Sequence, residues 1–485
     1  MNSVWAPCRR SWLRRRYATA AIPKPSQYGQ PTTLYHPQLV ADSELTPGFL
    51  AEEYEQRRRT LMDALPDSSV VVATAGTVKF MSGQIFYKFR QASDFWYLTG
   101  FDEPDSAVVL EKNSSSRGYR MTLFSLGRDS AKEKWDGART GFAEARAMFK
   151  ADDARSIDQF SPHLRSVLPG YSNIFADVPP GNNRRPSKKS ILQFLSSRSS
   201  TTEHDSILEA LSSSRRKPLA PKVARLRAIK SDAELRVMRE AARISGGAHA
   251  ATMQFARPGI SEASLAAHFE YICALGGSIR PAYVPVVASG ANALIIHYTS
   301  NNQLLQNNEL VLIDAGCEFN SYASDITRTF PVSGKFTSPQ RDLYAAVLSV
   351  QKELIELCTE ASGVSIHELH TRTCTLLRRE LKQIGIDAPG ADLDLLFPHY
   401  VSHPIGLDLH ESTYSDRLAR LRAGMVITVE PGIYVPPTPQ FPKHFHDIGI
   451  RIEDEVLVGE ETPEVLSSAA PKEIEAVEAA CQLES

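Results

Sequence analysis

Four acidic residues stand inside otherwise apolar, strand-like segments of this chain. Asp314 ends the run VLID, and Asp325 opens the run DITRTF. Glu430 ends the run MVITVE, and Glu453 lies within GIRIEDEVLV. Because removing an ionised carboxylate from water is costly, such a group is buried in a folded protein only when it is paired with a cation or bound to a metal ion. A fold for this chain must therefore bring counter-charge to these four side chains.

The first two acids predict a hairpin. Asp314 and Asp325 lie symmetrically about Phe319-Asn320, and the segments on either side have strand-like composition. A hairpin folded there places the two acids opposite each other, with their side chains on one face of the sheet. Like charges in that arrangement repel, so either one carboxyl is protonated or a cation lies between them.

Two divalent cations would neutralise all four carboxylates. Three histidines stand near the same segments: His297 in IIHYT, His403 in VSHPIG and His410 in LDLHES. A site built from carboxylate oxygens and one imidazole suits Mn²⁺, or Co²⁺ or Zn²⁺ under other loading conditions, better than it suits a thiolate-type zinc site. The association of histidines with paired carboxylates favours a metal site over isolated core or surface histidines.

A further histidine-rich segment does not fit a zinc protease. His367-Glu368-Leu369-His370 resembles the H-E-x-x-H motif but is one residue short. The spacing that the motif needs for its two ligands and its general base is therefore absent. We interpret this segment as a surface feature.

The second half of the chain predicts helices packed on an antiparallel sheet. Ser231 and Glu234 have the spacing of a capping box at the start of a helix. Further helices are expected after Ser261, at Ser338-Pro339 and after Ser365. The strand-like segments are 309–316, 323–331, 425–430 and 449–458. This pattern indicates the α+β class.

The first half predicts a smaller α/β unit. Apolar runs of strand length are SVVVATAG, DFWYLTGF, SAVVLEK and YRMTLFSL, all within residues 69–127, and the pattern between 133 and 170 is helical. A Ser-rich, basic stretch then ends at Pro218, which places the domain boundary near residue 220. No aromatic residues are interleaved with the Arg and Lys pairs of this stretch, so we interpret it as a solvated linker rather than a nucleic-acid surface.

The N-terminal segment differs from the rest of the chain in charge. Residues 1–41 contain six Arg and Lys residues and no acid, which leaves 48 basic against 56 acidic residues in the remainder. An Arg-rich, acid-free segment containing Ser and Ala is typical of mitochondrial presequences. Because Arg15-Arg16-Tyr17-Ala18 resembles the cleavage site of the matrix processing protease, we predict a presequence over 1–17 and an extended arm over 18–45. The alternative is a disordered basic tail or a nucleic-acid-binding arm.

The cysteines indicate a reducing compartment. They include no closely spaced pair and no C-x-x-C motif, so the sequence predicts free thiols rather than a disulfide framework. The chain also has no run of about 18 apolar residues, so no transmembrane segment is expected. The cysteines are Cys8, Cys273, Cys317, Cys358, Cys374 and Cys481.

Several motifs together resemble a known family. The blocks HYT, LIDAG, SDITRTFP, SHPIGLDLH, VEPGIY and GIRIED occur in the order in which pita-bread metallopeptidases carry their metal-binding and catalytic residues. The segment FRQASDFWYLTGFDEPDSAVVL, residues 89–110, is similar to the N-terminal domain of the aminopeptidase P branch. The resemblance covers roughly residues 45–465. It implies a smaller α/β N-terminal domain over 46–220, then a pita-bread catalytic domain, with helices on a curved antiparallel sheet, over 221–485.

The resemblance implies a ligand set for two metal ions. Asp314 would hold one ion, and His403 and Glu430 would hold the other. Asp325 and Glu453 would bridge the two ions, with a water or hydroxide between them. This inventory contains the four carboxylates and one of the imidazoles that the charge argument had already selected.

The resemblance also implies catalytic and substrate-binding positions. Glu430 is the expected proton carrier, and His297 and His410 flank the site as hydrogen-bond donors. His399 and Arg451 match positions that line the family's substrate pocket.

The implied reaction is hydrolysis of the first peptide bond, which releases one N-terminal residue. The substrates would be peptides with Pro in second place, mitochondrial proteins trimmed of their presequences, or both. The basic head narrows the resemblance to the mitochondrial, intermediate-cleaving members of the branch, in the matrix or at the inner membrane. No nucleic-acid partner is expected, and the resemblance is compatible with a homodimer. Many relatives have a Gly-rich loop before the ligand histidine, whereas residues 399–403 of this chain read HYVSH. Because a bulkier loop changes the shape of the site for the residue after the scissile bond, a strict preference for proline there does not follow.

Two other functions fit parts of the pattern. A prolidase-like dipeptidase would share the metal site, and a non-catalytic binding module would share the fold without the metal. All five ligand positions are intact in this sequence, which favours an enzyme over a binding module.

The presequence prediction can be tested by import. Replacing Arg15 and Arg16 together by Ala should leave the precursor unprocessed in isolated mitochondria, because the bases just before the cleavage site are removed. Replacing Arg9 and Arg10 removes the same charge and should leave the cleavage position unchanged. Normal maturation of the Arg15/Arg16 variant, followed by N-terminal sequencing, would contradict the assigned site.

Overall fold

The computed structural model describes residues 22–177 and 215–482. The predicted presequence, 1–17, lies outside the described residues, as does most of the predicted linker. The chain divides into two compact units between Leu226 and Arg227. None of the described helices is both long and apolar enough to cross a membrane.

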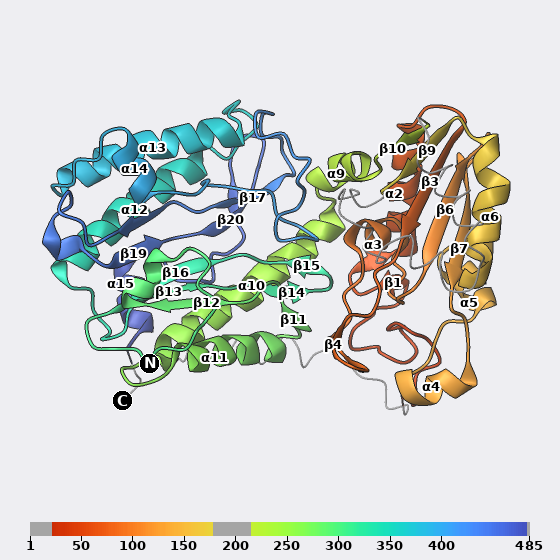
Figure 1. Ribbon diagram of the computed structural model, residues 1–485, viewed down its shortest axis with the longest axis horizontal. Helices are drawn as coiled ribbons and strands as arrows, with labels where there is room; N and C mark the ends of the chain where they lie inside the picture. Colours follow the sequence, from red (N-terminus) through yellow and green to blue (C-terminus); the bar gives the residue numbers. More distant parts are fainter. Residues whose placement is uncertain (1–21, 178–214, 483–485) are drawn as a thin grey trace. The chain divides into compact units, whose positions relative to one another are not determined.

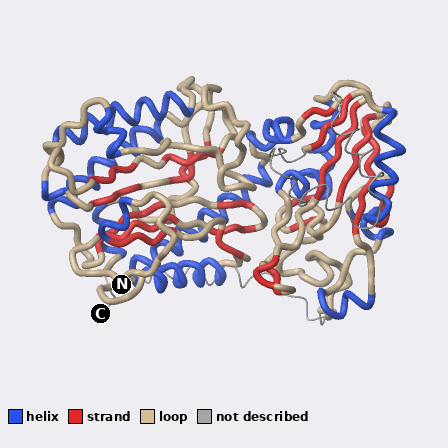
Figure 2. Tube along the Cα trace, viewed as in Figure 1, coloured by secondary structure: helices blue, strands red, loops and turns tan. Residues whose placement is uncertain are grey.

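Unit 1 is built around a mixed sheet of described strands in the order β10-β9-β3-β6-β7-β8 (Figures 1 and 2). β6 pairs antiparallel with both β3 and β7, whereas β8, β9 and β10 are parallel to the neighbours they pair with. The sheet strands are β3 (Ser69–Thr74), β6 (Ala107–Lys112), β7 (Tyr119–Ser125), β8 (Asp153–Ser156), β9 (Asn173–Ala176) and β10 (Arg216–Lys217). The helices are α2 (Ala51–Asp63), α3 (Ser93–Thr99), α4 (Ser130–Asp136), α5 (Phe142–Met148) and α6 (Phe160–Val167), with 3₁₀ turns η1 (Ile157–Gln159) and η2 (Leu168–Gly170).

Two short hairpins complete unit 1. They are β1 (Glu44–Thr46) with β2 (Phe49–Leu50), and β4 (Phe80–Ser82) with β5 (Ile85–Phe86). The core of the unit lies between the main sheet and α6, where Val72, Val109, Phe124 and Leu164 are buried. Burial of such β-branched and aromatic side chains on alternating positions is what the strand-like runs of the sequence predict.

One predicted strand of unit 1 is wrong. The run DFWYLTGF forms most of helix α3, which ends at Gly100. Gly100 has the left-handed φ of 70° that favours glycine, and its N–H bonds to the carbonyl of Trp96. Every residue from Phe95 to Thr99 is buried. A short apolar run buried on all sides has no periodicity that separates helix from strand. The stretch predicted as helical between 133 and 170 likewise contains a strand, β8.

Unit 2 opens with the capped helix that the sequence predicts. Ser231 accepts a hydrogen bond from the N–H of Glu234, and the Glu234 side chain accepts one from the N–H of Ser231. Ser261 and Ser365 cap the next predicted helices, whereas Thr337, one residue before the expected start, caps the third. The helices are α9 (Ala220–Ala228, across the boundary), α10 (Asp232–Phe255), α11 (Glu262–Leu275), α12 (Ser338–Glu356), α13 (Ile366–Gln383), α14 (Ala391–Leu396) and α15 (Ile474–Ala480).

The strands of unit 2 lie between two groups of helices. In Figure 1, α10 and α11 lie along one side of them and α12, α13 and α14 along the other. Every pairing between the described strands of this unit is antiparallel. The strands are β11 (Arg280–Pro281), β12 (Val286–Ser289), β13 (Leu310–Asp314), β14 (Cys317–Phe319), β15 (Tyr322–Ala323), β16 (Thr327–Pro331), β17 (Val426–Val429), β18 (Gly432–Val435), β19 (Ile448–Arg451), β20 (Asp454–Leu457) and β21 (Glu464–Val465), with 3₁₀ turns η3 (Gly290–Leu294) and η4 (Lys443–Phe445).

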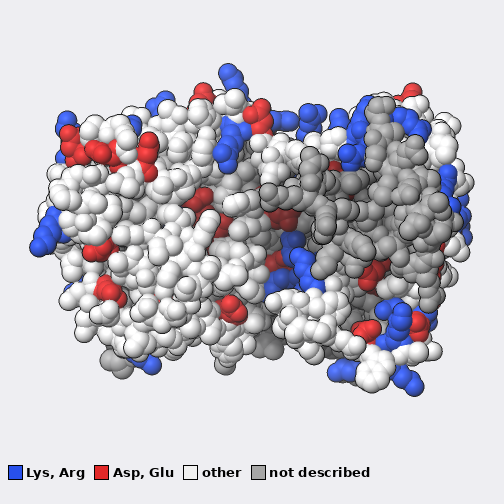
Figure 3. Space-filling view, in the orientation of Figure 1, with Lys and Arg blue, Asp and Glu red and all other residues white. Residues whose placement is uncertain are grey.

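Charged side chains do not define a basic face on the visible side of unit 2. Figure 3 shows acidic and basic residues of this unit scattered among uncharged ones. A nucleic-acid-binding surface needs clustered Lys and Arg to neutralise phosphates. This side of the unit offers no such cluster.

The predicted hairpin forms, but its register is wrong. The turn lies at residues 320–321, both of which have positive φ, as a two-residue hairpin turn requires. Asp314 is therefore opposite Thr327, not Asp325. Asp325 is two residues from Thr327, so the period of two along the strand still directs Asp325 toward the face that Asp314 occupies. Centring the turn one residue too early produced the error.

A buried ionic cluster joins β16 and β20 to helix α12 and to the segment 467–472. Arg328 and Asp454 are both fully buried, with Nη2 and Oδ1 2.7 Å apart. Asp454 also accepts hydrogen bonds from Gln351 of α12, Ser467 and Lys472, at 2.6–2.7 Å. Burial raises the pKa of the Asp454 carboxyl, but the charges of Arg328 and Lys472 outweigh it and hold the pKa well below its ordinary value.

The cluster predicts a large stability effect. Asp454→Asn should lower the free energy of unfolding of unit 2 by about 3–5 kcal/mol, because Arg328 is left as a buried, uncompensated charge. Far-ultraviolet circular dichroism in urea would measure it. Tryptophan fluorescence serves as the internal reference, since the Trp residues of the described part of the chain, Trp96 and Trp135, lie in unit 1 and no Trp occurs after residue 227.

The matched control is Glu353→Gln, which breaks the exposed pair of Glu353 with Arg379. An exposed pair contributes less than about 1 kcal/mol. Equal losses in the two variants would show that burial of the Asp454 cluster adds nothing to stability.

Candidate metal centre

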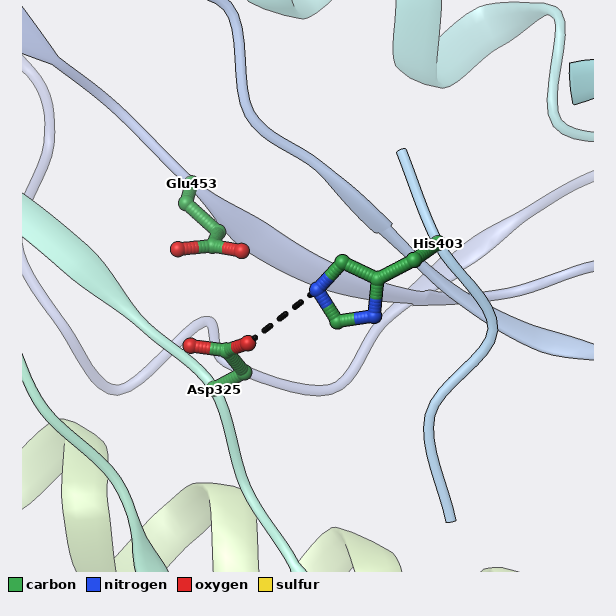
Figure 4. A group of neighbouring side chains, drawn as sticks. All are labelled: Asp325, His403 and Glu453. Carbon is green, nitrogen blue, oxygen red and sulfur yellow. Dashed lines mark ion pairs between the residues drawn. The ribbon is translucent and has the colours of Figure 1, made fainter. Parts of the chain in front are cut away.

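Three of the five predicted ligands converge in unit 2. Figure 4 shows the carboxylates of Asp325 and Glu453 and the imidazole of His403 pointing toward one another. One ligand atom from each lies within 4.8 Å of the others, and Nε2 of His403 is 3.3 Å from Oδ2 of Asp325. Asp325 lies between β15 and β16, Glu453 lies between β19 and β20, and His403 comes from the loop before β17. The site is thus assembled from segments far apart in sequence.

The remaining two predicted ligands lie beside these three. The phenol oxygen of Tyr283 is 2.5 Å from Oδ1 of Asp314 and 2.6 Å from Oδ1 of Asp325. On the other side, Oε1 of Glu430 is 3.7 Å from Nε2 of His403. All five residues therefore belong to one cluster.

Sequence reasoning missed Tyr283. It lies in the segment IRPAYVPVV, which carries no recognisable motif. The segment leads into β12, whose Val286 is paired with Asp314 of β13, and this pairing brings Tyr283 to the site. Strand register was the necessary signal, and a single sequence does not supply it.

The donor set fits divalent metal ions. His403 Nδ1 is 3.1 Å from the carbonyl of Pro404, and a carbonyl can only accept. Nδ1 therefore carries a proton, which leaves Nε2 facing the carboxylates as the ligand atom of the neutral ring. Four carboxylates and one imidazole are the ligand types that Mn²⁺ and similar ions take.

Without a cation, protons supply the counter-charge. Burial raises the pKa of the carboxyls of Asp314 and Glu453, and raises that of Glu430 to about 7. For His403 burial lowers the pKa, but the hydrogen bond with Asp325 and the charge of Glu430 outweigh burial and raise it to about 9. Burial also raises the pKa of Asp325, but the hydrogen bond and charge of His403, together with Tyr283 and Arg451, outweigh it and hold that pKa below its ordinary value. A divalent ion entering this site must displace protons.

Arg451 is bound into the cluster. Its side chain is 2% exposed. Nη2 donates to Oδ2 of Asp314 at 2.6 Å, Nη1 to the phenol oxygen of Tyr434 at 2.7 Å, and Nε to Oγ1 of Thr327 at 3.1 Å. Thr327 in turn donates to Oε2 of Glu453 at 2.6 Å. Arg451, which was predicted to line the substrate pocket, thus donates its hydrogen bonds to Asp314 and to the hydroxyl groups of Tyr434 and Thr327.

His399 lies on the Glu430 side of the cluster. Its Nδ1 is 2.8 Å from the carbonyl of Tyr400, so Nδ1 donates, and Nε2 accepts from the phenol of Tyr434 at 2.9 Å. Burial lowers the pKa of His399 to about 3, so the ring is neutral. Nδ1 is also 3.7 Å from Oε2 of Glu430.

The two predicted hydrogen-bond donors lie on the exposed side. The His410 ring centre is 4.2 Å from that of His403. His297 is exposed, and its charge helps to lower the pKa of both His399 and His410. The structure therefore places His410 beside His403 and His399 beside Glu430, and the charge of His297 acts on both of these histidines.

A buried salt bridge supports the His410 loop. Arg227 donates through Nε and Nη2 to the two carboxylate oxygens of Glu411, at 3.1 and 2.9 Å, and through Nη2 to Asp408 at 2.7 Å. Glu411 and Asp408 flank His410 in the sequence. Sequence reasoning missed Arg227, because its pairing with a loop far along the chain leaves no local pattern.

A fifth buried carboxyl supports the site from behind. Oε1 of Glu455 accepts a hydrogen bond from the N–H of Asp325 at 2.8 Å. Burial raises the pKa of Glu455 well above its ordinary value, and the charge of Asp325 adds to the shift. Glu455 therefore holds the backbone of Asp325 in place.

The His367–His370 segment is not part of the centre. Glu368 completes the cap of α13 through Ser365, and His367 and Glu368 are exposed, as the surface interpretation predicts. His370 is half-buried, and its ring is stacked on that of Tyr400 at 4.3 Å between centres. That residue therefore packs against the loop that carries His399.

Two family models match the chain. The model described as metallopeptidase family M24 matches residues 236–460, and the model described as the N-terminal domain of aminopeptidase P matches residues 54–175. Both matches agree with the predicted fold class, a pita-bread domain preceded by an α/β domain.

Curated relatives cover nearly the whole chain. Intermediate cleaving peptidase 55 of Saccharomyces cerevisiae is 39% identical over 94% of this chain and 88% of its own. Its crystal structure, lacking the N-terminal 58 residues, has a TM-score of 0.81 at 37% identity and covers 91% of this chain and 99% of that one. Xaa-Pro aminopeptidase 3 of Rattus norvegicus is 36% identical over 97% of this chain and 94% of its own. Intermediate cleaving peptidase 55, mitochondrial, of Arabidopsis thaliana is 37% identical over 96% of this chain and 89% of its own.

The raised pKa values predict that metal binding competes with protons. Mn²⁺ affinity should rise with pH between about 6 and 9, because the proton on His403 and those held by the raised carboxyls must leave before the ion binds. Isothermal titration calorimetry in buffers of different ionisation enthalpy would count the released protons.

His367→Gln removes an exposed imidazole outside the centre and should leave that count unchanged. Mn²⁺ binding that releases no protons, or whose affinity is flat across this pH range, would contradict the assigned ligands.

Proposed function

The chain belongs to metallopeptidase family M24, and from that membership we propose that it hydrolyses the first peptide bond of its substrates and releases one N-terminal residue. The proposed substrates are peptides with Pro in second place and mitochondrial proteins already trimmed of their presequences. The relatives named as intermediate cleaving peptidase and as Xaa-Pro aminopeptidase support both classes. The observation that carries the proposal is the convergence of Asp325, His403 and Glu453 within 4.8 Å.

Divalent metal ions are the cofactors that a metallopeptidase family implies, and two Mn²⁺ ions are our proposal for this chain. Asp314 would hold one ion, His403 and Glu430 the other, and Asp325 and Glu453 would be shared. The oxygen-rich donor set with a single imidazole supports this assignment. When bound, such ions polarise a peptide carbonyl and lower the pKa of a water molecule.

Glu430 is the proposed proton carrier. Its Oε1 accepts a hydrogen bond from Oγ1 of Thr428 at 3.4 Å, and its two oxygens lie 3.7 Å from His403 and His399. A carboxylate at that position can take a proton from the attacking water and pass it to the leaving nitrogen. Thr428, His403 and His399 thus fix the position of the Glu430 carboxylate beside the proposed ligands.

The exposed histidines complete the site. We assign His410 and His297 as hydrogen-bond donors to the carbonyl oxygen as it gains negative charge. Arg451 is assigned as a positioning residue for Asp314, because its hydrogen bonds are made to Asp314 and to the hydroxyl groups of Tyr434 and Thr327. His399 is assigned to the pocket wall beside Glu430.

The loop over residues 399–403 supports a relaxed preference for proline. The Tyr400 ring is held between the His370 ring and the guanidinium of Arg417, whose carbon lies 4.1 Å from the ring centre. A fixed, bulky loop shapes the space for the residue after the scissile bond differently from a Gly-rich one. We therefore propose that residues other than Pro are accepted there.

We propose a mitochondrial location. The acid-free, Arg-rich head supports it, and one relative carries the word mitochondrial in its name. A presequence peptidase acting first would expose the N-termini on which this chain acts.

Asp325→Asn should abolish turnover while leaving the fold intact, because it removes the negative charge of a shared ligand. We expect the rate of X-Pro peptide hydrolysis to fall by more than about 100-fold, beyond what supporting residues of metal sites contribute. Circular dichroism would verify the fold, and Glu353→Gln should retain full activity. Undiminished hydrolysis by Asp325→Asn would exclude the proposed centre.

N-terminal profiling of mitochondria from cells lacking the protein separates the substrate classes. Cells are complemented with the wild-type chain or with Asp325→Asn. Proteins retaining one extra residue in the Asp325→Asn cells would establish intermediate cleavage, whereas accumulation of X-Pro peptides alone would restrict the function to that class. Hydrolysis confined to dipeptides would instead indicate a prolidase.

A further inference from the structure

Two thiols meet in the interior of unit 2. Cys273 of α11 is 3% exposed and Cys317 of β14 is fully buried. Both line one cavity of about 130 Å³, together with Ser278, Glu270 and Arg280. Interaction between the two thiols is the largest influence on both pKa values, raising the pKa of Cys273 and lowering that of Cys317. The sequence, in which the two cysteines are far apart, gave no sign of this pair.

Hydroxyl groups surround Cys317. Its N–H is 3.0 Å from Oγ of Ser245 and 2.9 Å from Oγ of Ser324, and the Ser324 hydroxyl is 3.9 Å from Sγ. Hydrogen bonds from Cys273 and then from these serines lower the pKa of Cys317 to about 7, even though burial opposes them.

Other cysteines of unit 2 have a different environment. Burial raises the pKa of Cys358 and of Cys481 to about 12. A thiol in apolar surroundings is inert, whereas one held by donors reacts as a thiolate. Cys358 therefore provides an internal control for the reactivity of Cys317.

We propose that Cys273 and Cys317 form a reversible disulfide site for oxidation by hydrogen peroxide. The cavity gives the small oxidant room, since a water molecule occupies about 30 Å³ in the liquid. Cys273 and Cys317 both line this cavity, so the sulfenic acid formed on one lies beside the space that the other borders.

The chemistry balances in two steps. The Cys317 thiolate attacks one peroxide oxygen, the O–O bond breaks, and the departing hydroxide takes a proton to become water, leaving a sulfenic acid. Cys273 then attacks the sulfenic sulfur, the S–O bond breaks and a second water leaves. Two thiols lose two electrons, and one peroxide is reduced to two waters.

The disulfide would act on the metal centre through the backbone. Cys317 follows Asp314 by three residues, and Ser324 immediately precedes Asp325. At Gly316 the two strands touch so closely that an added Cβ would lie 1.7 Å from the Ser324 carbonyl oxygen. An S–S bond of about 2.05 Å is shorter than any non-bonded contact between two sulfur atoms, so bond formation draws β14 toward α11. That displacement reaches Asp314 and Asp325 together.

Thiol mapping of the full chain tests the site without reference to enzymatic activity. The protein is treated with hydrogen peroxide, alkylated and cut after Glu residues, which separates Cys273 in residues 271–309 from Cys317 in residues 310–318. Trypsin would leave both in one peptide, because Arg257 and Arg280 precede Pro. We expect the two peptides to be cross-linked and Cys358 to be alkylated.

Peptide hydrolysis by the Mn²⁺-loaded protein tests the consequence. Activity should fall by about fivefold or more, within the usual range of coupling between sites, and return with dithiothreitol. Cys273→Ser should abolish the dithiothreitol-reversible loss, Cys273→Ala serves if that variant does not fold, and Cys358→Ser should behave as wild type.

Two results would overturn the proposal. One is full alkylation of Cys273 and Cys317 under conditions that oxidise exposed thiols. The other is a reversible activity loss that persists unchanged without Cys273. Because the cross-link is read by mass, its absence is distinguishable from failure of the proposed peptidase function.

Discussion

Repulsion among buried carboxylates is the constraint on which unit 2 depends. Asp314, Asp325, Glu430 and Glu453 reach one point only because antiparallel strands bring distant segments together, and their negative charges oppose that assembly. Counter-charge comes from Arg451, from protons held at raised pKa values, and from divalent ions in the loaded protein. Because the ions bind the folded arrangement, their binding energy stabilises the unit that forms the site.

Arg451 changes the charge balance that the acids alone suggest. The two divalent ions of the proposed centre would cancel four carboxylates, but the guanidinium is also within the cluster, 2.6 Å from Asp314. The loaded centre with its arginine therefore carries one positive charge before substrate or solvent is counted. A hydroxide ion, the nucleophile that peptide hydrolysis requires, would bring the centre to neutrality. The buried arginine thus favours the charge state in which such a centre is ready to react.

The sequence predicted the residues that gather at the centre but not the residues that support them. Some signals are local in the sequence. Capping boxes predict where helices begin, and acids in apolar strands together with the ordered motif blocks predict which residues gather at the centre. Tyr283, Arg227 and Glu455 act through partners far along the chain, so they leave no local pattern. The hairpin error has the same origin, because the register depends on which residues adopt positive φ in the turn. The α3 error arose because full burial removes periodicity from a short helix.

Strand geometry links the reactivity of the centre to the stability of the fold. Successive residues of a strand face opposite sides. Thr327 faces the cluster while Arg328 faces the ionic network behind it, and Glu453 and Asp454 divide in the same way. Arg328 thus anchors the strand that carries Thr327, and Asp454 anchors the segment that carries Glu453. A substitution in the Arg328–Asp454 network would shift these strands and so change the distances between the carboxylates. The network behind the sheet therefore helps to fix the geometry of the centre.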